Sequence, residues 1–178
     1  QSVDLSGDGK LLATGGADRF VKAWTVADTK LVKAFEGHTH QVLGVTLKRD
    51  GRIIASAGAD NAVKVWSLVT GEVVRTIKGF DKEATSVSHV GVGDQFLATG
   101  GDGKVRLINE AGSDARSFSG AKDFMYATAA TPDGKVVIAG GQDGVLRVWN
   151  GANGSSIATF EPPSAPTPEP QKTAAVKK

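Results

Sequence analysis

Apolar and polar residues alternate along most of the chain with a period of two. This pattern is typical of β-strands, in which successive side chains point to opposite faces of the sheet. Within residues 38–79 the alternating segments are 41–47, 52–58, 62–68 and 72–79. Asp-Gly, Ala-Asp-Asn and Thr-Gly turns separate these segments. The pattern therefore predicts a four-stranded antiparallel meander.

This meander recurs four times along the chain. The stretches "GADRFVKAW" (16–24) and "GADNAVKVW" (58–66) are near copies, and "DGKVRLI" (102–108) and "QDGVLRVW" (142–149) continue the series. The aspartate of each copy recurs at intervals of 42, 42 and 41 residues. Four strands repeated at this interval predict an all-β fold, a β-propeller built of four-stranded antiparallel blades.

The repeat also predicts the domain organisation. Four blades are expected at residues 2–37, 38–79, 80–120 and 121–160, which together form one propeller unit over residues 1–160. The sequence then changes to "EPPSAPTPEPQKTAAVKK", which holds five of the six prolines and no aromatic residue. This composition predicts a Pro-rich, disordered C-terminal tail over residues 161–178.

The second repeat resembles the WD-repeat (WD40) unit in its motifs Gly37-His38, Asp50-Gly51, Ser56, Asp60 and Trp66. The resemblance covers about residues 2–160 and implies that the four blades are part of a larger ring of about seven. It also implies that four residues form a hydrogen-bonded structural tetrad: His38, Ser56, Asp60 and Trp66. Their chemistry suits such a chain, because an indole only donates, whereas a hydroxyl donates and accepts.

The other repeats keep only parts of this motif. The structural positions assigned by the resemblance are Thr14, Asp18, Trp24, Thr99, Asp102, Asp143 and Trp149. Blade three has Phe80 and Ile108 in place of the histidine and the tryptophan, and blade four has Ala121 and Ala139 in place of the histidine and the serine. We therefore expect a complete tetrad in blade two alone.

The C-terminal half resembles, more loosely, WD40 tracts of large bacterial proteins that carry c-type cytochrome modules elsewhere in the chain. The resemblance lies in "VGVGDQFLATGGDGKVRLIN", "SGAKDFMYATAATPDGKVVIAGGQDGVLRVWN" and "ATFEPP". It implies that the chain is an accessory propeller of an exported, redox-linked bacterial protein in the periplasm. The alternative location is the cytoplasm. The sequence holds no cysteine, so none of these residues attaches haem through a Cys-x-x-Cys-His motif.

Charge and composition argue against several kinds of partner. The 21 Lys and Arg oppose 19 Asp and Glu with alternating signs, so no nucleic-acid partner is predicted. No apolar run approaches the roughly 20 residues of a membrane helix, so no membrane span is predicted. One basic position recurs in every blade and is interpreted as a strand residue with a packed stem: Lys22, Lys64, Arg106 and Arg147.

Catalytic and metal chemistry are not predicted. The recurring aspartates are turn residues, and no separate set of Asp, His and Ser stands out. A lactonase-like propeller enzyme is therefore only a second alternative. His38 and His40 with His89 resemble a metal set, but the repeat assigns His38 to the tetrad and His89 to a first strand. We expect neither a metal site nor a cofactor.

The predicted function is a non-catalytic scaffold that presents rim loops to a protein partner. The loops before each first strand and between the second and third strands share one rim in WD40 blades, and the candidate residues there are His40, Gln41, Lys82, Glu83, Asp123, Phe124 and Gln142. Phe124 beside polar groups is typical of a binding hot spot, although it also suits a cap on blade four. Self-association is expected as well, because four blades leave two faces open.

Overall fold

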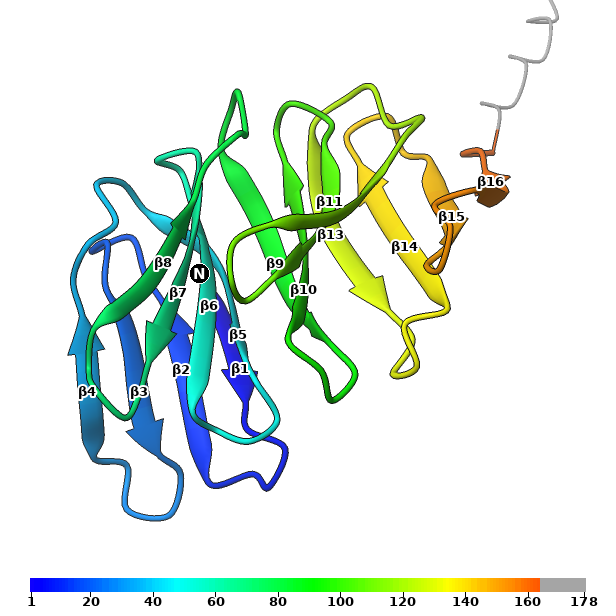
Figure 1. Ribbon diagram of the computed structural model, residues 1–178. Coiled ribbons are helices and arrows are strands. Elements are labelled where there is room, and N and C mark those ends of the chain that lie inside the picture. The colour runs from blue at the N-terminus through cyan, green and yellow to red at the C-terminus, as the bar shows by residue number, and fades with distance from the viewer. Residues whose placement is uncertain (164–178) are drawn as a thin grey trace, which may run out of the picture.

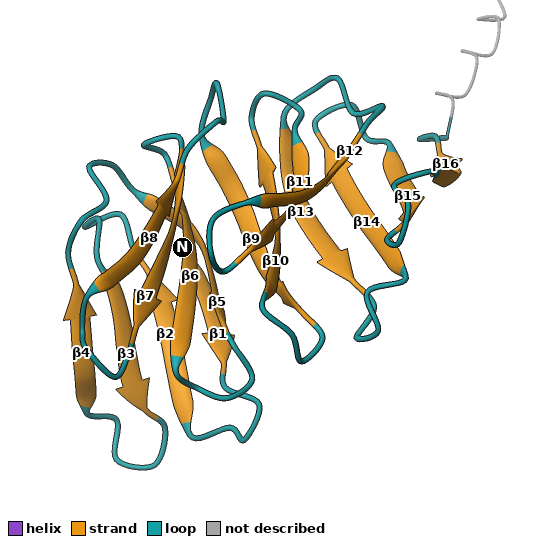
Figure 2. Cartoon of the chain, in the orientation of Figure 1, coloured by secondary structure: helices purple, strands orange, loops and turns teal. Residues whose placement is uncertain are grey.

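The chain folds into four separate β-sheets, shown in Figure 1 and Figure 2. The computed structural model describes residues 1–163, which hold sixteen strands and no helix. Consecutive strands of each sheet pair in antiparallel fashion. Successive side chains of a strand point to opposite faces, so an inner strand such as Ile53–Gly58, whose last five residues are all buried, supplies buried side chains to both faces of its sheet. The predicted all-β architecture of four-stranded blades is confirmed.

Each sheet is called a blade and numbered in chain order. Blade one contains β1 (Ser2–Leu5), β2 (Leu11–Gly15), β3 (Val21–Thr25) and β4 (Leu31–Phe35). Blade two contains β5 (Val42–Leu47), β6 (Ile53–Gly58), β7 (Ala62–Ser67) and β8 (Val73–Ile77). Blade three contains β9 (Ala84–Val90), β10 (Gln95–Gly100), β11 (Val105–Asn109) and β12 (Asp114–Phe118). Blade four contains β13 (Met125–Ala130), β14 (Val136–Gly141), β15 (Leu146–Asn150) and β16 (Ser156–Phe160).

The blades pack face to face in chain order, with their first strands as the inner edge. Strand β1 contacts β5, β5 contacts β9, and β9 contacts β13. The last strands, β4, β8, β12 and β16, each pair only with the third strand of their own blade. The tail predicted over residues 161–178 lies outside the described residues from 164 onward.

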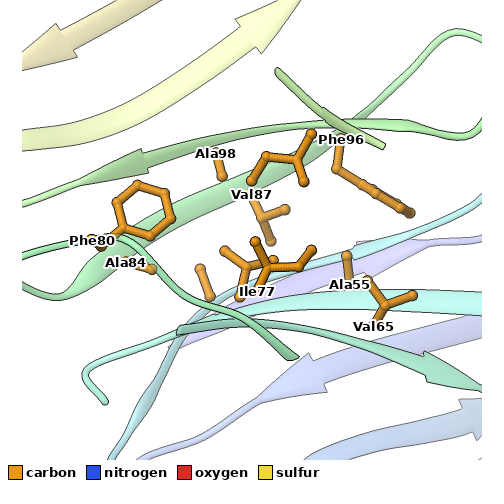
Figure 3. Packing of buried hydrophobic residues seen from close by; sticks show 11 residues of the cluster. Ala55, Val65, Ile77, Phe80, Ala84, Val87, Phe96 and Ala98 are labelled. Atoms are coloured by element: carbon orange, nitrogen blue, oxygen red, sulfur yellow. The ribbon is translucent and has the colours of Figure 1, made fainter. Parts of the chain in front are cut away.

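The hydrophobic core lies between the blades and consists of three clusters. Figure 3 shows the middle cluster, where Val65 and Ile77 of blade two meet Val87 and Phe96 of blade three. The first cluster joins Val21 and Phe35 to Trp66, and the last joins Phe118 to Trp149. Because these contacts come from facing sheets, each blade is stabilised by its neighbours as well as by its own hydrogen bonds.

Candidate interaction rim

The β4–β5 loop is anchored to blade two by a buried chain of side chains. Trp66 Nε1 donates to Ser56 Oγ at 2.8 Å, and Ser56 Oγ lies 2.7 Å from His38 Nε2. His38 Nδ1 lies 2.9 Å from both carboxylate oxygens of Asp60. Asp60 also accepts the backbone N–H of Thr39 at 3.0 Å. The structure thus brings together all four residues assigned to the tetrad and connects strands β6 and β7 to the loop.

This arrangement suits a neutral histidine. Because the indole only donates, the Ser56 hydroxyl accepts from Trp66 and is free to donate to His38 Nε2, while Nδ1–H donates to Asp60. Burial lowers the pKa of His38, although the Asp60 carboxylate partly offsets it. Burial opposes the ionisation of Asp60, but hydrogen bonds from His38 and the Thr39 N–H outweigh it and lower the pKa of that carboxyl. The pair is thus a neutral imidazole hydrogen-bonded to a carboxylate.

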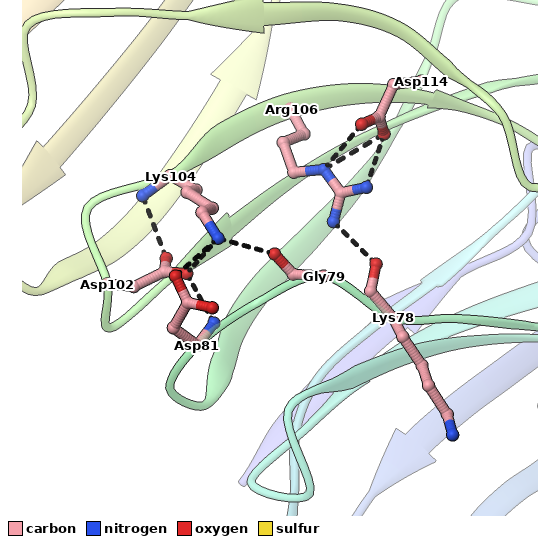
Figure 4. Close-up of polar contacts among 7 residues, drawn as sticks. All are labelled: Lys78, Gly79, Asp81, Asp102, Lys104, Arg106 and Asp114. Carbon is pink, nitrogen blue, oxygen red and sulfur yellow. Dashed lines mark hydrogen bonds and ion pairs between the residues drawn. The ribbon is translucent and has the colours of Figure 1, made fainter.

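Blade three anchors the equivalent β8–β9 loop by different means, shown in Figure 4. Asp102 accepts the backbone N–H of Asp81 at 2.7 Å, as Asp60 accepts that of Thr39. Lys104 Nζ donates to Gly79 O at 2.7 Å and to Asp81 Oδ2 at 2.8 Å. Burial opposes the ionisation of Asp102, yet the N–H groups of Asp81 and Lys104 outweigh it and lower its pKa.

Arg106 completes the blade-three anchor. Its guanidinium carbon lies 4.8 Å from the centroid of the Phe80 ring, a cation–π contact. Nη2 and Nε donate to Asp114 Oδ1 at 2.6 and 3.0 Å, and Nη1 donates to Lys78 O at 3.0 Å. The phenylalanine at the histidine position is thus held by a buried cation from the third strand.

A glycine makes room for the ring in both loops. A side chain at Gly58 would place its Cβ 2.4 Å from His38 Nδ1, and one at Gly100 would place it 2.5 Å from Phe80. Both distances are far below a van der Waals contact, so these positions exclude larger residues. The glycine at the end of the second strand, Gly58 or Gly100, therefore leaves the space that the His38 or Phe80 ring fills.

Blades one and four keep only some of these contacts. Trp24 Nε1 donates to Thr14 Oγ1 at 3.0 Å, and Asp18 pairs with Lys22. In blade four Ala139 stands at the position of Ser56 and offers no hydroxyl. Trp149 Nε1 donates instead to the carbonyl of Ser119 at 2.9 Å. Asp143 pairs with Arg147 at 2.6 Å, and Arg147 Nε donates to Gly120 O at 3.1 Å. The repeated basic residue thus binds loop carbonyls or carboxylates in blades three and four.

The assignment of Thr99 to a structural position of the repeat was wrong, because Thr99 is not the blade-three equivalent of Ser56. Strand pairing sets Ser56 opposite Lys64 and Ala98 opposite Arg106, so Ala98 is the blade-three equivalent of Ser56. Thr99 points to the other face, where its hydroxyl lies 3.0 Å from Thr85 Oγ1. A shift of one residue along a strand reverses the face, which explains the error.

The rim loops occupy equivalent places in three blades. The carbonyls of Gln41, Glu83 and Phe124 accept the N–H of Ala59, Gly101 and Gln142 at 2.9, 2.8 and 2.8 Å. Each loop before a first strand is therefore fastened to the turn between the second and third strands of the same blade. The side chains at these three equivalent positions are an amide, a carboxylate and an aromatic ring.

Phe124 is half-buried rather than free. Its ring packs over Gly101 of blade three, where an added Cβ would lie 2.5 Å from Cε2 and 3.1 Å from Glu83 Oε2. The Phe124 ring centroid lies 5.2 Å from that of Tyr126, whose exposed fraction is 57%. Tyr126 was missed from the sequence, because it lies at the bulge between Met125 and Ala127, where the alternation of faces is interrupted.

The remaining candidate residues carry mixed charge. His40, Gln41, Lys82, Asp123 and Gln142 are exposed, and Glu83 is half-buried. Asp123 Oδ1 accepts the N–H of Phe124 at 2.7 Å. The rim can thus offer donors, acceptors and one exposed aromatic side chain to a partner.

The described residues include no group of three or more His, Cys, Asp or Glu side chains placed to hold a metal ion. Likewise, no helix among residues 1–163 is long and apolar enough to cross a membrane.

Comparisons with known proteins agree with this architecture. The family model described as "WD domain, G-beta repeat" matches residues 1–25, 29–67, 71–109 and 112–150. The last three ranges each contain the outer strand of one blade and three strands of the next. No curated protein matches the chain.

Among solved structures, "Structure of U3-55K" resembles the chain with a TM-score of 0.82 at 22% sequence identity. The similarity covers 90% of this chain and 49% of that one, so the chain spans about half the length of this neighbour. The likeness shows the fold, and four blades fit a partial propeller. Four matched repeats over most of the sequence and the repeated loop anchors show that the chain belongs to the WD40 family.

Proposed function

We propose that this WD40 segment is a non-catalytic scaffold whose rim binds a protein partner. The observation that carries the proposal is the contrast between backbone and side chains at Gln41, Glu83 and Phe124. Their carbonyls make the same hydrogen bond in three blades, whereas their side chains differ in charge and shape. The repeated backbone hydrogen bond stabilises the fold, whereas recognition of one particular partner depends on side chains that differ between the blades.

The exposed part of the aromatic pair is the centre of the proposed surface. Tyr126 offers a large ring with a hydroxyl, a combination that is enriched at binding hot spots. Lys82 and Asp123, both exposed, supply opposite charges to the rim, and this mixture suits a protein surface better than the uniformly negative backbone of a nucleic acid.

A matched pair of double variants tests the proposal. Tyr126→Ser with Lys82→Glu changes the rim, and Val92→Ser with Arg49→Glu makes similar changes in the turns at the opposite ends of the first strands. Phe124 is left intact because its ring also packs on Gly101. The immobilised chain is exposed to cell extract, and bound proteins are identified by mass spectrometry.

We expect the wild type and the control to capture the same partner, and the rim variant to lose it at an unchanged melting temperature. Capture by the rim variant at the wild-type level, or no capture by any form, would refute the proposal.

A further inference from the structure

The turn between β15 and β16 contains two Asn-Gly pairs, Asn150-Gly151 and Asn153-Gly154. No other asparagine of the sequence precedes a glycine. Blade two has Thr70-Gly71 at the place of the second pair, since Gly71 N and Gly154 N each donate to the carbonyl four residues earlier. Thr70 is exposed, as Asn153 is, although blade two has a neighbouring blade on either side. Exposure at this position is therefore a property of the turn.

An Asn-Gly pair contains both partners of a cyclisation reaction. The backbone nitrogen of the glycine can attack Cγ of the asparagine and close a five-membered succinimide ring. Glycine favours this attack because it has no Cβ to hinder the approach to its nitrogen. In a folded chain the rate depends on what surrounds the amide oxygen of the asparagine and what holds the glycine N–H.

The amide oxygen of Asn153 accepts two hydrogen bonds from one residue. Ser155 N donates to Asn153 Oδ1 at 2.9 Å, and Ser155 Oγ donates to the same oxygen at 2.8 Å. Negative charge develops on Oδ1 when Gly154 N attacks Cγ, and donors already placed at that oxygen stabilise it as an oxyanion hole does. The bond to Ser155 N also forms an Asx-turn across Gly154, which keeps Cγ near the Gly154 nitrogen.

The glycine nitrogens distinguish the two pairs. Gly154 N donates to Asn150 O at 2.8 Å within one turn, which is largely exposed. Gly151 is buried, and its N donates to Lys135 O at 2.7 Å in the β13–β14 turn. A Cβ added at Gly151 would lie 1.8 Å from Gly134 O, so these two turns are in close contact. Gly154 N is released by a local movement of one turn, whereas Gly151 N is released only when two turns separate.

We propose that Asn153 is a self-modifying site, at which Gly154 N closes a succinimide with the assistance of Ser155. A base from the solvent removes the Gly154 amide proton, and the nitrogen forms a bond to Asn153 Cγ. The bond from Cγ to Nδ2 then breaks, and Nδ2 takes up a proton and leaves as ammonia. Water adds to one of the two ring carbonyls and the ring opens to aspartate or isoaspartate. The net reaction consumes one water and releases one ammonia, and nothing is oxidised or reduced.

The product changes the charge beside a cation of blade three. A Cβ added at Gly154 would lie 3.1 Å from Arg116 Cδ, and Arg116 Nη1 donates to Gly151 O at 2.5 Å. The reaction therefore creates a carboxylate next to the Arg116 side chain. Isoaspartate also lengthens the backbone of the turn by one carbon, so we expect the bond from Gly154 N to Asn150 O to be lost. The contact between the turn and the neighbouring blade is thus altered irreversibly.

Incubation of the full 178-residue chain at neutral and at mildly alkaline pH tests the proposal. Samples are digested with pepsin in acid, where ring closure is slow, and aspartate and isoaspartate at positions 150 and 153 are quantified by mass spectrometry with electron-transfer fragmentation. Ser155→Ala removes one donor to the amide oxygen, and Ser155→Thr keeps a hydroxyl there. Ser156→Ala, at the adjacent exposed serine, is the matched control. Each chain is also incubated in urea, which unfolds the turn.

We expect folded wild type to react at Asn153 at least about tenfold faster than at Asn150, because the two glycine nitrogens differ in local opening. The rate should rise with pH, and isoaspartate should be among the products. Ser155→Ala should slow the reaction at Asn153 by about threefold to tenfold in the folded chain, whereas Ser155→Thr and Ser156→Ala should react as the wild type does. In urea the effect of Ser155→Ala should disappear.

Four results would overturn the proposal. The first is no conversion at Asn153, or equal rates at Asn150 and Asn153 in the folded chain. The second is an unchanged or faster reaction in Ser155→Ala, which would mean that the turn only protects the amide. The third is the same effect of Ser155→Ala in urea, and the fourth is aspartate without isoaspartate, which would exclude the succinimide.

Discussion

Blades two and three each anchor the loop before their first strand with an equivalent aspartate, but the contacts around that aspartate differ. Asp60 and Asp102 both accept a backbone N–H of the loop, at 3.0 and 2.7 Å. In blade two a neutral histidine connects the aspartate to Ser56 and Trp66. In blade three a buried arginine holds Phe80 and a carbonyl of the loop.

The difference shows which part of the anchor the loop requires. The aspartate is common to both blades because it satisfies the backbone N–H at the loop. The remaining contacts are interchangeable so long as they fill the space above Gly58 or Gly100 and leave no buried group unpaired. Blade three, which has Phe80 and Ile108 at the histidine and tryptophan positions, therefore anchors its loop by other contacts.

Trp66→Ala should produce the largest effect on this comparison. It removes a large buried ring, which typically costs about 3 to 5 kcal/mol of the free energy of unfolding, and leaves Ser56 without its donor. Ile108→Ala removes a smaller side chain that takes no part in a polar network. Urea denaturation of both variants measures the difference, and an equal loss would show that the tetrad adds nothing to packing.

His38→Phe converts the blade-two anchor partly into that of blade three. It leaves the Ser56 hydroxyl and the Asp60 carboxylate without the imidazole, at a cost of about 1 to 3 kcal/mol for each buried group left unpaired. Adding Lys64→Arg places a guanidinium at the Arg106 position and should restore about 0.5 to 1 kcal/mol by a cation–π contact. A double-mutant cycle measures this coupling, and its absence would mean that the two anchors are not interchangeable.

Arg106→Lys should weaken the blade-three anchor by a smaller amount, about 1 kcal/mol. Lysine cannot reproduce the fork toward Asp114 or the stacking on Phe80. Faster hydrogen exchange in residues 78–83 with unchanged exchange in residues 36–41 is the expected result. Arg52→Lys, an exposed change in blade two, is the control, and equal effects of the two substitutions would contradict the role of Arg106.

Much of this comparison could be predicted from sequence, and the rest depended on packing between elements. The repeat and its alternation predicted the blades, and the resemblance of the second repeat to a WD40 unit assigned His38, Ser56, Asp60 and Trp66 to the tetrad. The Arg106 anchor was not predicted, because its partner Asp114 lies on another strand beyond a bulge. The packing of Phe124 on Gly101 was not predicted either. It is a contact between two blades, and the periodicity within one repeat does not show such contacts.

Acid should destabilise the blade-two anchor more than the blade-three anchor, because only the blade-two anchor contains a histidine. The pKa of His38 is lowered in the folded chain, so below about pH 6.5 the unfolded chain binds more protons. The stability from the neutral tetrad is therefore complete above that pH and is lost as the pH falls. Asp60 and Asp102 both have lowered pKa values, so their shared contribution persists down to about pH 4.

The amide protons of Thr39 and Asp81 test the central claim most directly, because they are equivalent donors to Asp60 and Asp102. Their hydrogen-exchange protection factors, which are corrected for the intrinsic pH dependence of exchange, are measured by NMR at about pH 7.5 and about pH 5. The account predicts that protection of Thr39 falls several-fold on acidification while that of Asp81 stays constant. An equal fall at both amides, or constant protection at Thr39, would contradict it.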